Sequence, residues 1–196
     1  MAGSDTKEKL VLAAIDLFST KGFAGTSVDE IAAAAGVKGP SVYKHFKSKE
    51  ALLDAIIDRA DTEYNKGMGL MADKLRFSSG RELKEFSMHQ IAFTLDNEEI
   101  RKMRRLLNIE QYRNEVLSER ATHHQIANLT KFYTGIFKKM MADGVMVEGD
   151  PEILALQYTG AVSILIQLCD RSPEKIPEVM NRIERLLEQF VKTFCN

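Results

Sequence analysis

The chain has 196 residues, of which 44% are hydrophobic and 28% are charged, and its formal net charge is −1. This composition is typical of a globular protein and excludes a disordered chain, a collagen-like chain and a disulfide scaffold. The small net charge also excludes a protein that holds nucleic acid by its overall charge, although a local basic patch remains compatible with it.

Neither the N-terminus nor the apolar runs predict export or a membrane span. The first twelve residues, MAGSDTKEKLVL, carry acidic groups where a signal peptide has a basic stretch followed by an apolar one. No run approaches the roughly 18 consecutive apolar residues that cross a membrane. Cys169 and Cys195 are therefore interpreted as free or buried thiols in a reducing compartment.

The residue types predict an all-α fold. Leu, Ala, Met, Glu and Lys dominate, strand-like alternation is absent, and the four prolines and twelve glycines lie between the periodic apolar segments. The expected helices span residues 6–21, 28–36, 40–47, 48–73, 81–95, 100–107 and 115–143, followed by one that begins at Pro151 and a last one that begins at Pro173 or Pro177.

The first fifty residues carry the pattern of a helix-turn-helix. Ser27 and Glu30 form a capping-box pair, which starts a short helix, and Gly36 ends it. Ala32 and Val42 stand where a small contact residue and an aliphatic anchor are needed on either side of the turn.

This segment also concentrates positive charge. From Lys38 to Lys49, both included, there are four lysines and no acidic residue, and His45 lies among them. Donors on a rigid helix suit base edges and phosphates. The alternative interpretation is a three-helix packing unit whose charges are simply solvated.

The sequence resembles a known family at this point. Residues 26–32 (TSVDEIA) and 35–53 (AGVKGPSVYKHFKSKEALL), including the pattern Tyr-x-His-Phe-x-x-Lys-x-x-Leu at 43–52, resemble the N-terminal domain of TetR-family bacterial transcriptional regulators. The resemblance implies a three-helix helix-turn-helix DNA-binding domain over residues 1–50. A larger helical domain for effector binding and dimerisation would follow over residues 51–196.

The resemblance also implies roles for individual residues. The positions expected to contact phosphates are Ser27, Tyr43, His45 and Lys49, and those expected at bases or thymine methyls are Gly39, Pro40, Ser41 and Lys44, with the basic Lys38 beside them. At two positions the chain departs from the family pattern: Lys38 replaces a Ser or Thr cap, and Pro40 stands where a glycine is frequent. The operator sequence therefore stays open.

Two further groups of residues are singled out in the C-terminal part. The last two helices have more apolar surface than one small bundle covers, which predicts a homodimer through Ile164, Leu168, Ile183, Leu187 and Phe190. Methionines, aromatic residues and a few neighbours form a pool for a small-molecule pocket, although ordinary core explains the same spacing. This pool comprises Met68, Met71, Phe86, His89, Phe93, Met103, Leu107, Tyr112, Phe132, Tyr133, Phe137 and Tyr158.

The expected function is a homodimeric repressor of the bacterial cytoplasm and nucleoid, released from a palindromic or pseudo-palindromic double-stranded DNA operator by a small-molecule effector. A corepressor strengthened by its ligand, or an activator, is the alternative within the same fold; a helical enzyme or interaction protein is the alternative outside it. The four histidines lack metal-ligand spacing, and no Gly-x-Ser-x-Gly or phosphate loop is present. We therefore expect no catalytic residue, metal, cofactor or membrane partner.

Overall fold

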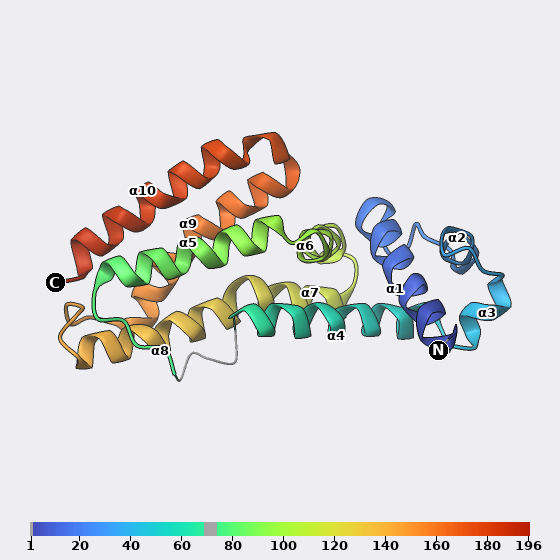
Figure 1. Ribbon diagram of the computed structural model, residues 1–196, viewed down its shortest axis with the longest axis horizontal. Helices are drawn as coiled ribbons and strands as arrows, with labels where there is room; N and C mark the ends of the chain where they lie inside the picture. The colour runs from blue at the N-terminus through green and yellow to red at the C-terminus, as the bar shows by residue number, and fades with distance from the viewer. Residues whose placement is uncertain (1, 69–73) are drawn as a thin grey trace. The chain divides into compact units, whose positions relative to one another are not determined.

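The computed structural model describes residues 2–68 and 74–196 (Figure 1). Its helices are α1 (Ala2–Lys21), α2 (Val28–Ala34), α3 (Gly39–Tyr43), α4 (Lys49–Met68), α5 (Gly80–Asp96), α6 (Glu98–Glu110), α7 (Glu115–Thr122), α8 (Asn128–Ala142), α9 (Pro151–Arg171) and α10 (Ile176–Phe194). Within these described ranges there is no strand, and Met146 and Cys195 form an isolated antiparallel bridge. The prediction of an all-α fold is confirmed.

Several helix boundaries differ from the predicted ones: α1 begins at Ala2 instead of residue 6, α6 extends to Glu110 instead of residue 107, and three further differences concern the shape of the chain. The third helix ends at Tyr43 rather than near Lys47, and in the turn that follows the N–H groups of His45 and Phe46 both donate to the Val42 carbonyl at 2.9 Å. The single helix expected over 115–143 is interrupted by a π-helical turn, His123–Ala127. A 3-10 turn, Pro173–Lys175, precedes α10, so the α-helix proper begins after the first proline and before the second.

The chain divides into two compact units. Unit 1 contains residues 1–64 and 98–119, and unit 2 contains residues 65–97 and 120–196. This is a division by packing. The boundary expected at residue 50 concerns what each part binds, and it stays a prediction.

The core of unit 1 is built on α1. Leu10, Ala14 and Phe18 recur on one face of this helix and are fully buried. α6 packs along α1, and α2 contacts both α1 and α3. The Arg59 guanidinium on α4 pairs with Glu99 of α6 and with Glu8 of α1, and these carboxylates raise its pKa. The three-helix N-terminal segment is thus held against α4 and α6.

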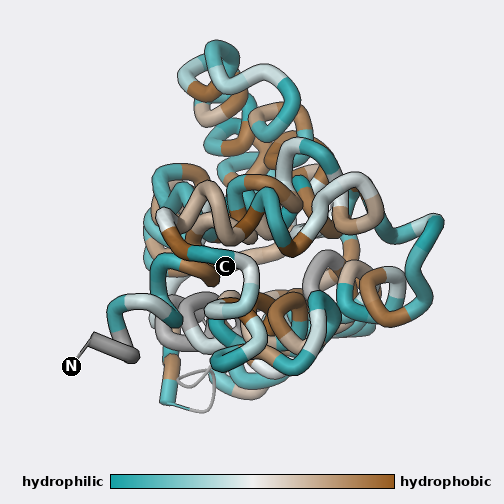
Figure 2. Tube along the Cα trace, turned by 90° about the vertical axis from the view of Figure 1, so that its right-hand side faces the viewer, coloured by the Kyte–Doolittle hydropathy of each residue, from teal (hydrophilic) through white to brown (hydrophobic). Residues whose placement is uncertain are grey.

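Unit 2 is a bundle in which α8 packs on α9 while α10 contacts both α5 and α9 (Figure 1). Hydrophobic and hydrophilic residues alternate along the helical turns, as amphipathic helices require (Figure 2). The Lys84 ammonium on α5 lies 2.6 Å from a Glu188 carboxylate oxygen on α10, and this pair raises the pKa of Lys84 and lowers that of Glu188.

Candidate nucleic-acid interface

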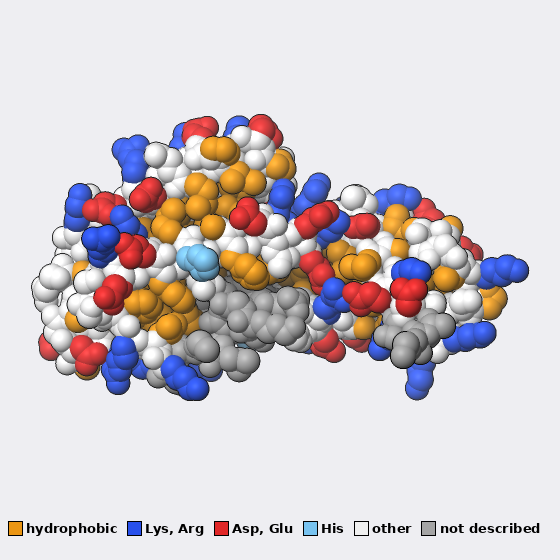
Figure 3. Space-filling model, viewed as in Figure 1, with side chains coloured by type: hydrophobic (Ala, Val, Ile, Leu, Met, Phe, Trp, Pro, Cys, Tyr) orange, Lys and Arg blue, Asp and Glu red, His pale blue; other side chains and the backbone are white. Residues whose placement is uncertain are grey.

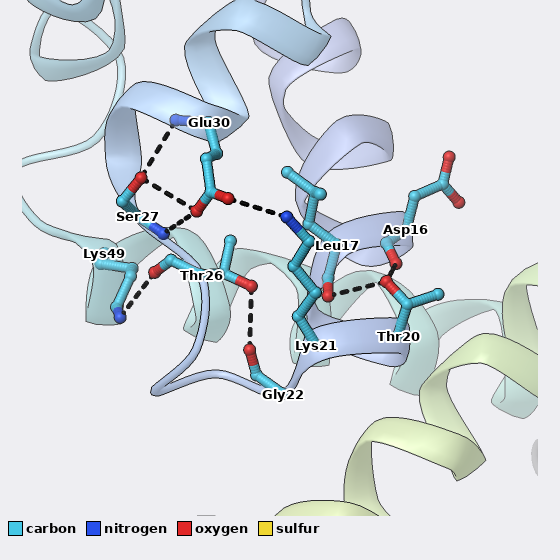
Figure 4. A network of polar contacts seen from close by, with 9 residues as sticks. All are labelled: Asp16, Leu17, Thr20, Lys21, Gly22, Thr26, Ser27, Glu30 and Lys49. Atoms are coloured by element: carbon cyan, nitrogen blue, oxygen red, sulfur yellow. Dashed lines mark hydrogen bonds and ion pairs between the residues drawn. The ribbon is translucent and has the colours of Figure 1, made fainter.

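The N-terminus of α2 is fixed by the capping box that the sequence predicts. The Ser27 hydroxyl accepts from the Glu30 N–H at 3.2 Å, and the Glu30 carboxylate accepts from the Ser27 N–H at 2.8 Å (Figure 4). Lys21 lies 2.7 Å from the same carboxylate. These hydrogen bonds, first that of Lys21, lower the pKa of Glu30 to about 2. A phosphate contact through the Ser27 N–H or hydroxyl therefore requires that group to break its hydrogen bond with the Glu30 side chain.

The turn after α2 has the geometry of a helix-turn-helix. Gly36 adopts φ +69°, a conformation that other residues enter only with strain. Ile31 and Ala32 of α2 are buried on one side of this turn, and Val42 and Phe46 are buried on the other. The apolar faces of α2 and α3 thus lie inward, and the remaining face of α3 is left toward solvent.

α3 begins without a side-chain cap. Lys38 occupies the N-cap with no hydrogen bond from its side chain, and Pro40 lies in the first turn, where its missing N–H removes no helical bond. Gly39 lies against α2 so closely that a Cβ there would be 2.7 Å from an Asp29 carboxylate oxygen. This oxygen is the far end of the exposed Asp29 side chain, so a shift of that side chain would make room for a Cβ.

The residues expected to contact DNA all belong to unit 1 and differ in their exposure. Tyr43 is 59% exposed. Lys38, Lys44 and Lys47 are also exposed, and basic side chains project from the surface in the region of α2 and α3 (Figure 3). Ser27 and Pro40 share this exposure, whereas Gly39, Ser41, His45 and Lys49 are half-buried.

Two of these residues differ from their expected setting. Lys44 is the C-cap of α3, one residue beyond its last turn, and not a residue in the middle of the recognition helix. The Lys49 ammonium donates to the carbonyls of Phe23 and Thr26 at 2.8 and 2.9 Å and lies 4.3 Å from the centre of the Phe23 ring. It is therefore already bound to the protein's own backbone.

Glu110, which the sequence analysis did not single out, meets the same loop. Its side chain is buried, and its carboxylate accepts the Phe23 N–H at 2.8 Å across 87 residues of sequence. No local motif marks this glutamate, so only the tertiary structure identifies it.

The pool proposed for an effector pocket is divided between the two units. Phe86, Phe132, Tyr133, Phe137 and Tyr158 come together in one aromatic cluster of unit 2, with ring centroids of neighbouring pairs 5.0–6.2 Å apart.

Other members lie elsewhere. Met103 and Leu107 belong to α6 and are buried in unit 1, and Tyr112 is 90% exposed. His89 and Phe93 are exposed on α5. Met71 and the side chain of Met68 lie outside the described residues.

The predicted dimer residues require a correction. Ile183 and Leu187 are 0% and 1% exposed because they face the interior of unit 2, so they do not form an outer surface. Phe190 packs on Tyr158 with ring centroids 4.7 Å apart. Leu168 is half-buried, whereas Ile164 is 66% exposed. The exposed apolar residues of the last two helices instead include Ile153, Leu156, Ile164 and Leu186.

This exposure makes α9 unusual. Among the described residues, α9 is the one helix that is long and apolar enough to cross a membrane by length and composition. Of its most apolar stretch of 18 residues, 28% is buried. Counting consecutive apolar residues did not predict this, because Thr159, Gly160 and Ser163 interrupt the run. An open groove of about 700 Å³ adjoins it, lined by Leu165 of α9 and by Arg182, Arg185, Leu186, Glu188, Gln189 and Lys192 of α10.

Comparisons with known proteins find sequence similarity in the N-terminal segment. Residues 10–56 match the family model described as bacterial regulatory proteins, tetR family. Over 50 residues the chain is 48% identical to an uncharacterized HTH-type transcriptional regulator of Bacillus subtilis, YerO. The aligned segment covers 26% of this chain and 17% of YerO. Over 48 residues it is 44% identical to IcaR, the negative transcriptional regulator of the biofilm operon of Staphylococcus aureus. This alignment covers 24% of this chain and 26% of IcaR. The matches thus span about a sixth to a quarter of these relatives.

The fold extends the similarity over the whole chain. The structure of SmeT in complex with triclosan superposes with a TM-score of 0.78 at 22% identity, covering 97% of this chain and 92% of that one. SmeT is the repressor of a Stenotrophomonas maltophilia multidrug efflux pump. At this identity the likeness establishes a shared architecture.

Proposed function

We propose that the chain is a sequence-specific transcriptional regulator, and not an enzyme, that binds its operator as a homodimer; the match of residues 10–56 to the family model described as bacterial regulatory proteins, tetR family, supports this proposal. The observation that carries this proposal is the exposed surface of α3. A glycine turn and the buried Val42 and Phe46 hold that helix, while Tyr43 and Lys44 are left facing solvent. An α-helix of this kind fits the major groove of duplex DNA.

A homodimer supplies the second recognition helix. One such helix contacts few base pairs, and a two-fold dimer places two of them about 34–36 Å apart on one side of the duplex. The exposed apolar residues Leu156 and Ile164 of α9, with Leu165 and Leu186 at the adjoining groove, favour a second copy on this face. Burial of the apolar part of this surface favours association, and the charged side chains that line the groove would lie beside it.

Repression with release by a small molecule is the form of regulation that the relatives support. IcaR is named a negative regulator, and SmeT is named a repressor and was solved with triclosan. In this chain, the aromatic cluster of unit 2 is the candidate effector site. The effector changes DNA affinity only by as much as it prefers one of two conformations. A ligand that strengthens operator binding would instead indicate the corepressor mechanism.

The palindromic operator and a place in the bacterial cytoplasm, at the nucleoid, follow from the same proposal. A two-fold protein contacts two equivalent half-sites, so the operator has the same symmetry. The apolar face of α9 is assigned to the second copy rather than to a membrane.

Anisotropy of labelled duplex DNA tests the interface directly, with Lys44→Ala as the variant. Loss of a base contact would cost about 1–3 kcal/mol at one symmetric pair of operator positions and less on random DNA. Lys138→Ala is the matched control, because Lys138 is an exposed lysine of unit 2. A uniform loss over all single-base variants would make Lys44 a phosphate contact, and an equal effect of both variants would contradict the proposed surface.

A further inference from the structure

The loop between α1 and α2 is bound from two sides by charged groups that lie far apart in the sequence. On one side, the Glu110 carboxylate at the end of α6 accepts the Phe23 N–H. On the other, the Lys49 ammonium at the start of α4 donates to the Phe23 carbonyl and to the Thr26 carbonyl, the latter drawn in Figure 4. Both polar groups of the Phe23 main chain are thus bound by opposite charges.

The rest of the loop is closed by its own contacts. The Thr26 hydroxyl donates to the Gly22 carbonyl at 2.9 Å, and the Thr26 side chain is buried. Gly22 adopts φ +79°, and a Cβ at this position would lie 2.5 Å from the Glu110 carboxylate. The glycine at position 22 therefore allows the positive φ of the turn and leaves space for the Glu110 carboxylate.

This loop sets the position of α2. Thr26 is followed directly by Ser27, the N-cap of α2, whose N–H and hydroxyl meet the Glu30 carboxylate. A displacement of Thr26 would move the start of α2, and the turn at Gly36 links α2 to α3. The position of the recognition helix therefore depends on the contacts that hold the loop.

We propose that Lys49 and Glu110 are positioning residues for DNA binding, which act by holding the Gly22–Thr26 loop and not by contacting DNA. The inference rests on the proposed DNA-binding function. It replaces the phosphate contact expected for Lys49, since two hydrogen bonds and the Phe23 ring already engage its ammonium group. Charge-assisted hydrogen bonds of this kind are stronger than neutral ones, so they hold the loop in its conformation.

Salt dependence separates a positioning lysine from a phosphate-binding one. Each lost phosphate contact makes the slope of log K against log salt shallower by about one unit. We expect Lys49→Ala to weaken binding of a fluorescein-labelled, random-sequence duplex by about tenfold with an unchanged slope. A slope shallower by one unit, or an affinity equal to that of the wild type, would overturn the proposal for Lys49.

Glu110 is tested by a pair of variants. Glu110→Gln keeps a side-chain oxygen that can accept the Phe23 N–H, whereas Glu110→Ala leaves that N–H without this partner. We expect the alanine variant to lose about tenfold in DNA affinity and the glutamine variant to retain most of it, both with the wild-type slope. Equal affinities for the two variants would contradict the positioning role.

Hydrogen exchange followed by mass spectrometry reports on the loop even where a variant folds poorly. Exchange should rise in residues 22–31 in Lys49→Ala and Glu110→Ala, and it should stay at the wild-type rate in α9 and α10. A general rise throughout the chain, or none in residues 22–31, would overturn the inference. If the wild-type protein fails to bind the duplex at low salt, the proposed function itself fails, which is a separate result.

Discussion

Ser87 is the centre of a buried hydroxyl network in unit 2 whose hydrogen bonds can be counted completely. Its hydroxyl donates to the Leu83 carbonyl at 2.9 Å. The Tyr158 hydroxyl donates to the Ser87 oxygen at 2.9 Å, and the Tyr133 hydroxyl lies 3.0 Å from it. Since the serine hydrogen is used on Leu83, both tyrosines donate and the serine oxygen accepts twice.

Ser87→Ala should therefore destabilise the protein far more than loss of either tyrosine hydroxyl. It leaves two buried phenol donors without their acceptor, at about 1–3 kcal/mol each, or about 2–6 kcal/mol together. Tyr158→Phe removes one donor and leaves only a serine lone pair unused, which costs about 0.5–1.5 kcal/mol. The contrast arises because Ser87 and the two tyrosines are buried.

Urea unfolding followed by circular dichroism measures both variants, with the free energy of unfolding extrapolated to water. An unchanged m value would show that the comparison concerns the same transition. Equal destabilisation by Ser87→Ala and Tyr158→Phe would refute the idea that one serine oxygen satisfies both phenols.

Three further outcomes follow from the structure. Gly36→Ala should destabilise the protein by about 1–2 kcal/mol in urea unfolding, because Gly36 has a positive φ. Gly135→Ala, at an unobstructed position in α8, should stabilise the protein slightly. The reverse order of stabilities would contradict the turn geometry. Burial raises the pKa of Tyr133 from 10.0 to about 12, so its contribution to stability should be complete below pH 10 and be lost as the pH rises toward 12. Tyr133→Phe should reduce this alkaline loss, and an identical pH profile would speak against it. Ile164→Glu should give a monomer in sedimentation at micromolar concentration, since it places a charge on the exposed apolar face of α9; a monomeric wild type would exclude the dimer.

Local patterns predicted those parts of the fold that depend on neighbours in the sequence. The Ser27–Glu30 capping box and the turn at Gly36 both need only a few residues, and the structure contains both. The exposed position of Tyr43 follows from the burial of Val42 and Phe46 on the opposite side of the same short segment.

Features that depend on distant residues were not predictable in this way. A lysine at the start of a helix suggests a phosphate contact, but the carbonyls that bind Lys49 lie 23 and 26 residues earlier. An amphipathic pattern shows that Ile183 and Leu187 are covered, and it does not say whether their own unit or a second copy covers them. The π-helical turn at His123–Ala127 likewise has no turn residue to mark it.

Operator binding by a homodimer is tested most directly by an unbiased selection of bound duplexes from a random DNA library with the wild-type protein. A two-fold dimer should enrich an inverted repeat whose half-sites lie about one helical turn apart, roughly 10–10.5 base pairs from centre to centre, or a multiple of it. An enriched sequence without two-fold symmetry, or no enrichment at low salt, would contradict a dimer that reads DNA through α3.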